Sequence, residues 1–229
     1  MTVFQLKLLA IITMAIDHIG LFFFPEHITW RIIGRLAFPI FAWLIANGAR
    51  HTHNINAYLK RLLIFALISQ IPYWLAFRLI DPTFISPNIF FTLFLGLLAI
   101  KIIQGKKQLW LSVVITIICA LCAYLMQASY GIVGVLSMVF FYIFFEQKIY
   151  LFLSEAIIFL LPLMAASWPV FKPLSPYLMD NFIYQPVCLA SLFLIFLYND
   201  QQGLKAKYFF YIFYPAHFFI IYLVKLIAY

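Results

Sequence analysis

Two ionisable residues, Asp17 and His18, interrupt the first long apolar run of the chain, Val3 to Phe24. An ionised side chain placed in hydrocarbon costs about 2.5–3.5 kcal/mol on insertion scales, so each of these residues needs a partner or a chemical task. A carboxylate can bind a cation, and an imidazole can take up or release a proton near neutral pH. The pair indicates a polar site within an apolar protein.

Asp17 and His18 require different partners, because successive residues of a helix point about 100° apart. Arg35 lies one helical turn after Arg31 in the next apolar run and is the counter-ion expected for Asp17. Two interpretations are open: an ion pair that only joins two helices, or a charged group that belongs to a functional site.

His18 follows Lys7 by eleven positions. This spacing is three helical turns plus about 20°, so both side chains share one helix face and lie about 16 Å apart along the axis. A groove with a cation at one end and an imidazole deep in the membrane suits a long cofactor with a charged head and a thin reactive arm. Coenzyme A has this shape. The alternative is a lysine that orients the helix and a hydrogen-bonded interior histidine.

Further polar residues stand in apolar surroundings. Asn88 and Tyr130 begin predicted helices at their outer ends, and His217 lies near the middle of the last apolar run. For His217, a hydrogen bond between helices is the competing interpretation to a catalytic role.

A basic segment follows the second apolar run. It contains Arg50, His51 and His53, and Lys60 and Arg61 follow it. These charges either contact anionic lipid headgroups and orient the protein, or bind phosphate groups through charge-assisted hydrogen bonds. We expect no metal site at His51 and His53, because no third ligand lies nearby in the sequence.

The composition determines what kind of scaffold positions these residues. Of the 229 residues, 66% are hydrophobic and 10% are charged, whereas soluble domains are about 45–50% apolar and about 25% charged. The chain is therefore expected to be an all-α, polytopic integral membrane helix bundle, and residues 1–229 to form a single transmembrane domain.

About nine transmembrane helices are predicted from the apolar runs. They are Val3 to Phe24, Trp30 to Gly48, Ala57 to Ile80, Asn88 to Ile103, Leu109 to Gln127, Tyr130 to Phe145, Ile149 to Ala166, Phe182 to Tyr198 and Tyr208 to Ala228. Pro39 and Pro72 fall inside predicted helices, where the lost backbone hydrogen bond must be compensated. The connection from Trp168 to Pro176 is expected to be extended.

The distribution of Lys and Arg predicts a cytoplasmic N-terminus, because basic residues favour the cytoplasmic side. With nine helices, one side holds Lys7, Arg50, Lys60, Arg61, Lys101, Lys106, Lys107, Lys148, Lys205 and Lys207, and the other holds Arg31, Arg35, Arg78, Lys172 and Lys225. The net charge of +8 is thus explained by topology, and no nucleic-acid partner is expected. Cys119, Cys122 and Cys188 lie in apolar runs and are interpreted as apolar residues.

Several short motifs, in order along the chain, resemble the TraX family of bacterial membrane proteins. They include Ala15-Ile16-Asp17-His18, Gly34-Arg35-Leu36-Ala37-Phe38-Pro39, Asn47-Gly48-Ala49-Arg50-His51, Ser69-Gln70-Ile71-Pro72, Asn88-Ile89-Phe90, Ser129-Tyr130-Gly131 and Tyr214-Pro215-Ala216-His217. The resemblance runs from about Lys7 to the C-terminus. Relatives commonly carry an acidic residue where this chain has Ser129.

This resemblance implies a multi-pass protein of the bacterial inner membrane that transfers an acetyl group from acetyl-CoA to the N-terminus of a pilin subunit, or to another acceptor. Lys7 and His18 also match the spacing of a basic residue and a histidine in the first helix of broader membrane acyltransferases. His18 is the expected base, with Asp17, Asn88, Tyr130 and His217 as further catalytic candidates. Lys7, Arg35, Arg50, Lys60 and Arg61 are the expected acetyl-CoA ligands.

Two other classes of function remain open at this stage. A transporter would place a polar pathway along Asp17, His18, Arg35 and His217, and a non-catalytic assembly factor would hold a small apolar subunit without chemistry. Direct transfer and an acetyl-histidine intermediate are equally compatible with these residues.

Overall fold

The computed structural model describes residues 1–105, 108–166 and 184–228, and this part of the chain is helical, without strands. Four helical stretches are long and apolar enough to cross a membrane: Val3–Phe23, Ile28–His51, Ile55–Phe77 and Tyr208–Ala228. Large apolar side chains lie on their outer surfaces, such as Ile71, which is 65% exposed. Such surfaces are stable against lipid, so the all-α membrane fold is confirmed.

Each predicted apolar run contains a helix in the described part of the chain. The helices are α1 (Val3–Phe23), α2 (Ile28–Gly34), α3 (Ala37–His51), α4 (Ile55–Phe77), α5 (Ile89–Gln104), α6 (Leu109–Leu125), α7 (Gly131–Ile143), α8 (Lys148–Ala166), the 3₁₀ helix η2 (Gln185–Leu189), α10 (Ala190–Phe196) and α11 (Lys207–Ala228). The connection predicted at Trp168 to Pro176 lies outside the described residues. Nine membrane crossings and a cytoplasmic N-terminus stay predictions.

The sequence predicted a single helix for the second run. In the structure this run breaks at Arg35 and Leu36 into α2 and α3. Pro39 is the reason. It has no N–H to bond to the carbonyl of Arg35, four residues earlier, so a continuous helix would lose this bond. After the break, Pro39 lies in the first turn of α3, where N–H groups have no partner within the helix. Pro72 lies inside α4 as predicted, and Pro215 lies inside α11.

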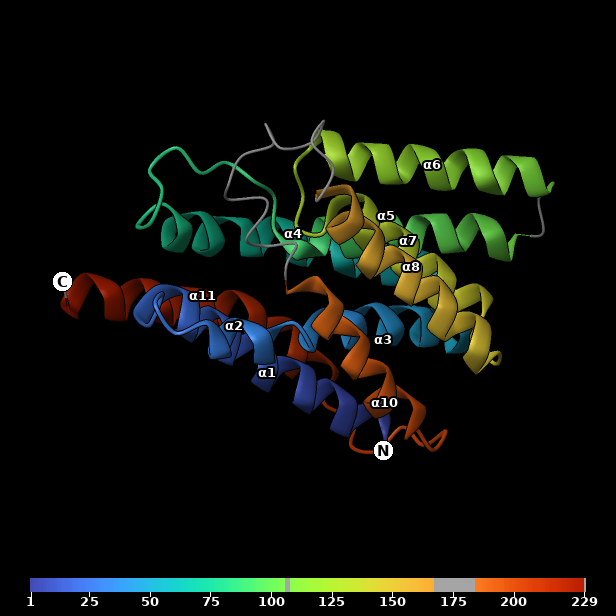
Figure 1. The fold of residues 1–229 in the computed structure, drawn as a ribbon, viewed down its shortest axis with the longest axis horizontal. Helices are drawn as coiled ribbons and strands as arrows, with labels where there is room; N and C mark the ends of the chain where they lie inside the picture. The colour runs from blue at the N-terminus through green and yellow to red at the C-terminus, as the bar shows by residue number, and fades with distance from the viewer. Residues whose placement is uncertain (106–107, 167–183, 229) are drawn as a thin grey trace. The chain divides into compact units, whose positions relative to one another are not determined.

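The chain divides into two compact units, which we describe separately. Unit 1 comprises Met1–Phe41 and Phe144–Leu204, and unit 2 comprises Ala42–Ile143 and Lys205–Tyr229. In unit 1, α1 packs on α2, and α8 packs on η2. In unit 2, α5, α6 and α7 pack on one another, and α4 packs on both α5 and α11 (Figure 1). The prediction of one domain is not tested by this division.

The start of α1 is held in unit 1 by the segment after α10. Val3 N donates to Gln201 O at 2.9 Å, and Phe4 N donates to Gln202 O at 3.1 Å. Gly203 has a φ of +69°, and a Cβ there would lie 2.7 Å from Thr2 Oγ1. Thr2 and Gln5 close a capping box over the first turn. Together these bonds anchor the helix that carries Lys7, Asp17 and His18.

Candidate functional site

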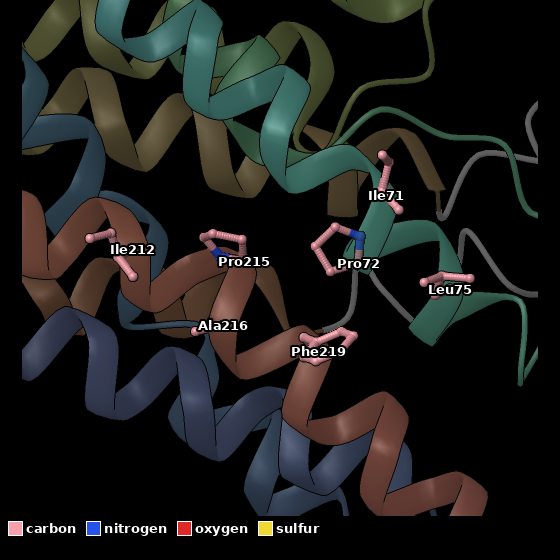
Figure 2. A pocket seen from close by; sticks show the side chains of 7 residues that line it. All are labelled: Ile71, Pro72, Leu75, Ile212, Pro215, Ala216 and Phe219. Atoms are coloured by element: carbon pink, nitrogen blue, oxygen red, sulfur yellow. The ribbon is translucent and has the colours of Figure 1, made fainter.

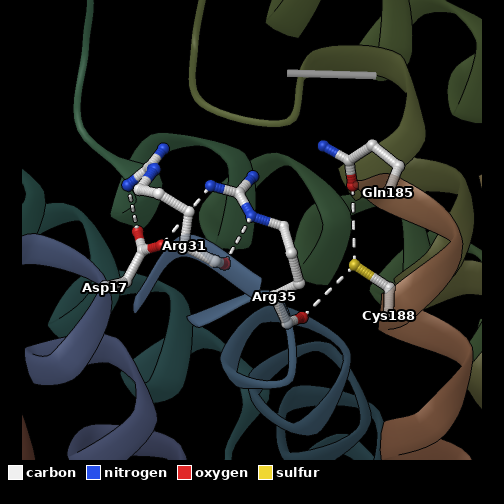
Figure 3. Close-up of polar contacts among 5 residues, drawn as sticks. All are labelled: Asp17, Arg31, Arg35, Gln185 and Cys188. Atoms are coloured by element: carbon white, nitrogen blue, oxygen red, sulfur yellow. Dashed lines mark hydrogen bonds and ion pairs between the residues drawn. The ribbon is translucent and has the colours of Figure 1, made fainter. Parts of the chain in front are cut away.

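Asp17 forms ion pairs with two arginines in unit 1 (Figure 3). The distance from Arg31 Nη1 to Asp17 Oδ2 is 2.7 Å, and the distance from Arg35 Nη2 to Asp17 Oδ1 is 3.4 Å. The predicted pairing with Arg35 is confirmed, but Arg31 is the closer partner. Gly34 allows this contact, because a Cβ at this position would lie 2.2 Å from Asp17 Cβ.

The break between α2 and α3 creates a second contact in the same place. The Arg35 carbonyl, which Pro39 cannot use, accepts a hydrogen bond from the Cys188 thiol at 3.2 Å. Figure 3 shows Gln185 on the other side of this thiol, with its Oε1 at 3.5 Å. Cys188 was predicted to be simply apolar, yet it joins η2 to the end of α2.

Glu155 on α8 is fully buried in unit 1. Its carboxylate lies within electrostatic range of the Cys188 thiol, as do Arg35 and Asp17. Sequence reasoning assigned no role to Glu155. The available signal was the charge balance: two arginines and one aspartate within the first apolar runs need a second carboxylate to be neutral inside a membrane.

Lys7 and His18 lie on one uninterrupted helix, α1, so the predicted shared face exists. Both side chains are half-buried. Because Asp17 is bonded to two arginines of the neighbouring chain segment, the rotation of α1 about its axis is fixed, and the direction of His18 is fixed with it. The ion pairs of Asp17 thus set the direction in which His18, the next residue, points.

Asn88 begins α5 in unit 2, as predicted, and is fully buried. Its Oδ1 accepts from Phe90 N at 3.0 Å, and its Nδ2 donates at 2.8 Å to both Ala66 O and Gln70 Oε1. Gln70 in turn donates to Ser86 O at 3.1 Å. An oxyanion role for Asn88 would require one of these bonds to be given up.

Tyr130 lies in a turn with left-handed backbone. The φ angles of Gln127, Tyr130 and Gly131 are 54°, 62° and 41°. Such a conformation is rare for a bulky residue and persists only where the surroundings impose it. Thr92 Oγ1 donates to Ser129 O at 2.6 Å, and Tyr73 Oη lies 3.3 Å from Ser129 Oγ. These two bonds hold the turn between α6 and α7.

His217 is buried on α11. Its Nδ1 lies 3.1 Å from Phe213 O, so Nδ1–H donates within the same helix, and Nε2 is the acceptor of the neutral ring. The ring lies 4.1 Å from Phe218 and 5.4 Å from Tyr214 between centroids. Tyr214 accepts a hydrogen bond from the Ile89 backbone, which joins α11 to the start of α5.

A wholly apolar groove of about 320 Å³ lies beside this region, between α4 and α11. Pro72 and Pro215 face each other across it in Figure 2. The groove contains no candidate catalytic residue, but Tyr73, Tyr214 and His217 neighbour its lining residues in the sequence.

The predicted acetyl-CoA ligands divide between the units. Lys7 and Arg35 belong to unit 1, and Arg50, Lys60 and Arg61 belong to unit 2. Arg35 is buried and bound to Asp17, so binding a phosphate would require a change of partner.

Within unit 2, the three cations differ in their surroundings. Arg50 and Lys60 are exposed, whereas Arg61 is half-buried, with its guanidinium 5.3 Å from the centre of the Tyr58 ring. The Arg50 guanidinium also lies near an aromatic ring, 6.0 Å from the centre of Tyr142.

Residues 3–225 match the family model TraX, described as TraX protein. The chain belongs to the TraX family. It is 33% identical to the "probable fimbrial assembly protein FimC, serogroup H1" of Dichelobacter nodosus, over 93% of this chain and 91% of that protein.

Two further matches cover less of the chain. The chain is 30% identical to "Protein TraX" of Escherichia coli over 58% of this chain and 52% of that protein. It is 38% identical to an uncharacterized protein of Rickettsia prowazekii over 40% of this chain and 33% of that protein. No solved structure matches the chain.

The TraX motifs gather in two places. Asp17, His18 and Arg35 belong to unit 1. The segments around Gln70, Asn88, Ser129 and Tyr214 meet in unit 2 through the hydrogen bonds given above, although about 140 residues separate the first from the last.

Proposed function

We propose that this TraX family protein is a membrane acetyltransferase that uses acetyl-CoA from the cytoplasm. The acceptor is an amino group, such as the N-terminus of a subunit of a pilus or fimbria. A hydroxyl acceptor would follow the same chemistry. The family supports this proposal, and so does the relative named as a probable fimbrial assembly protein. The protein acts in the inner membrane of a bacterium.

One observation carries the proposal: Lys7 and His18 lie on the same continuous helix, and ion pairs of Asp17 fix its rotation. Lys7 is suited to bind a phosphate near the membrane surface, and His18 lies about 16 Å along the helix axis. A pantetheine arm extended along this face brings a thioester toward the imidazole.

The reaction balances with the groups present. The acceptor nitrogen attacks the thioester carbonyl while the imidazole of His18 takes its proton. The C–N bond forms, the C–S bond breaks, and the CoA sulfur leaves and receives the proton from His18. General base catalysis of this kind contributes about 10²–10⁴-fold to the rate. Arg35 belongs to the same unit as His18. It is the candidate donor to the transient oxyanion, and it would have to give up its bond to Asp17 to serve.

The test uses the full chain in detergent, radiolabelled acetyl-CoA and an acceptor peptide with a free N-terminus. We expect His18→Ala to lower the initial rate about 100-fold or more, and the exposed His53→Ala to retain the wild-type rate. Undiminished transfer by His18→Ala would exclude His18 as the base. Label on the protein without peptide would indicate an acetyl-histidine intermediate.

A second candidate function is supported by the printed name of the Dichelobacter relative. A non-catalytic assembly factor would hold an apolar subunit in the membrane through surfaces such as the groove of Pro72 and Pro215. It would co-purify with the subunit, and its function would survive His18→Ala. Loss of subunit acetylation in cells that carry His18→Ala would exclude it.

A further inference from the structure

The apolar groove between α4 and α11 lies entirely within unit 2. Both helices are among those long and apolar enough to cross a membrane. Ile71 of α4 and Ile212 of α11 line the groove, and these side chains are 65% and 56% exposed. The groove is therefore open to the lipid that surrounds the protein.

The dimensions of the groove restrict what can occupy it. On α11 the lining extends from Ile212 to Phe219, which is about 10 Å along a helix. The volume of about 320 Å³ then corresponds to a mean cross-section of about 30 Å². An α-helix with its side chains is about 10–12 Å in diameter, or about 80–110 Å² in cross-section. The groove therefore admits a single hydrocarbon chain but not a further helix.

A basic residue continues the lining of the groove on α4. Ile71, Leu75 and Arg78 are spaced four and three residues apart, so they share one face of the helix. Arg78 lies within about 20° of Ile71 around the helix and about 10 Å beyond it. Arg78 N donates to Trp74 O at 2.9 Å, which extends the last turn of α4 to this residue. One face of α4 thus leads from apolar side chains to an exposed guanidinium.

The Arg78 guanidinium is held in place without a carboxylate. Its Nε donates to Phe84 O at 3.2 Å, and its Cζ lies 5.5 Å from the centre of the Trp74 ring. The carboxylate of Asp81 instead accepts from Thr83 N at 2.9 Å and Thr83 Oγ1 at 2.7 Å. In the described part of the chain, no acidic residue forms an ion pair with Arg78. Its two Nη groups can therefore donate to the oxygens of a phosphate.

We propose that the groove binds one anionic phospholipid, with an acyl chain between α4 and α11 and the phosphate on Arg78. Tryptophans such as Trp74 are typical of the level of the headgroups, and a groove about 10 Å long fits within one leaflet of about 15 Å.

The headgroup decides which lipid binds. Lipid tails are as apolar as the groove, so the tail alone gives little preference among phospholipids. A zwitterionic headgroup brings its own cation close to Arg78, whereas an anionic headgroup does not. The guanidinium therefore provides the preference for an anionic lipid. This inference does not depend on acetyl transfer.

The test measures lipid bound to the full chain by native mass spectrometry. The protein is delipidated in detergent and mixed with equal amounts of phosphatidylglycerol and phosphatidylcholine that carry identical acyl chains. We expect the state with a single bound lipid to contain phosphatidylglycerol about five times as often, the contribution of one basic residue near an anionic headgroup. Arg78→Gln should reduce this preference to less than about twofold.

Lys148→Gln is the matched control for the charge. Lys148 is also exposed, and its Nζ lies 5.6 Å from the centre of the Phe196 ring, but it belongs to neither α4 nor α11. This variant should retain the wild-type preference.

A second variant tests the groove itself. Ala216→Phe adds a ring where the acyl chain would lie (Figure 2), so the preference should fall to less than about twofold, and adding Arg78→Gln should change nothing more, because both substitutions act on the same bound lipid. Ile220→Phe is the control, since Ile220 is 59% exposed on α11 but does not line the groove. Ala216→Leu replaces Ala216→Phe if the phenylalanine variant does not fold.

Equal binding of the two lipids by the wild type would overturn the inference. A preference that survives Arg78→Gln would exclude the guanidinium, and one that survives Ala216→Phe would exclude the groove. A dimer that Ala216→Phe separates would mean that a second copy occupies the groove instead. His18→Ala should show the wild-type preference, so the lipid site and the proposed function are tested separately.

Discussion

Units 1 and 2 satisfy polar groups inside the membrane in different ways. Unit 1 uses charges: the carboxylate of Asp17 lies between the guanidinium groups of Arg31 and Arg35. Unit 2 uses neutral amides and hydroxyls, with Asn88, Gln70 and Thr92 bonded to backbone carbonyls and to each other. Charge pairs hold two segments in one orientation, whereas neutral groups complete the backbone hydrogen bonds of helix ends and turns.

This difference determines how strongly substitutions destabilise each unit. Loss of one member of a buried charge pair leaves an uncompensated charge, which is more costly than loss of a neutral hydrogen bond. Unit 1 should therefore be the more sensitive unit. Substitutions in both units, each measured as thermal unfolding of the detergent-solubilised protein, test this contrast.

The largest effect is expected for Asp17→Leu. This substitution leaves Arg31 and Arg35 as neighbouring like charges, so unfolding should become easier by about 3 kcal/mol, the lower end for a broken buried pair, because these side chains are partly exposed. The exposed Arg78→Leu serves as a charge-removal control. Equal unfolding midpoints for the two variants would show that the ion pairs contribute no more than a surface charge.

Gly34→Ala should cost about 2–3 kcal/mol, because its Cβ would overlap the Asp17 side chain and push α1 away from α2. In unit 2, a Cβ at Gly96 meets Met138 Cε at 2.0 Å. The flexible end of a methionine can move, so Gly96→Ala should cost only about 1 kcal/mol. If Gly96→Ala were more destabilising than Gly34→Ala, the proposed contrast between the ion-paired unit 1 and the more easily repacked core of unit 2 would be wrong.

Asn88→Ala removes the N-cap of α5 and should cost about 1–2 kcal/mol. Asn88→Asp keeps the acceptor for Phe90 N but loses the donors to Ala66 and Gln70, so it separates the cap from the amide network. If Asn88→Asp is as stable as the wild type, the network contributes nothing and only the cap matters.

The smallest effect has the opposite sign. Gln127 is exposed and has a φ of 54°, so Gln127→Gly should stabilise the protein by about 0.5–1 kcal/mol through relief of left-handed strain. Met126→Gly, at a φ of −73°, is the control and should destabilise by a similar amount. Destabilisation by both variants would show that the turn is not strained.

Much of this architecture was predictable from the sequence, because a membrane leaves only a few ways to bond the backbone. Most apolar runs located a helix to within a few residues, although the second run contains two helices. An isolated charge in such a run required a partner, so the pairing of Asp17 with Arg35 followed. The start of a helix at Asn88 followed from its place before an apolar run.

The tertiary structure decided which polar groups meet. The break at Arg35 frees a carbonyl for Cys188, and no local pattern predicts a contact between residues 153 positions apart. Glu155 was likewise hidden, because its importance lies in its complete burial. The hydrophobic pattern of each helix can be read directly from the sequence. Whether a buried polar group finds a hydrogen-bond partner depends on distances between helices, which are defined only in the folded protein.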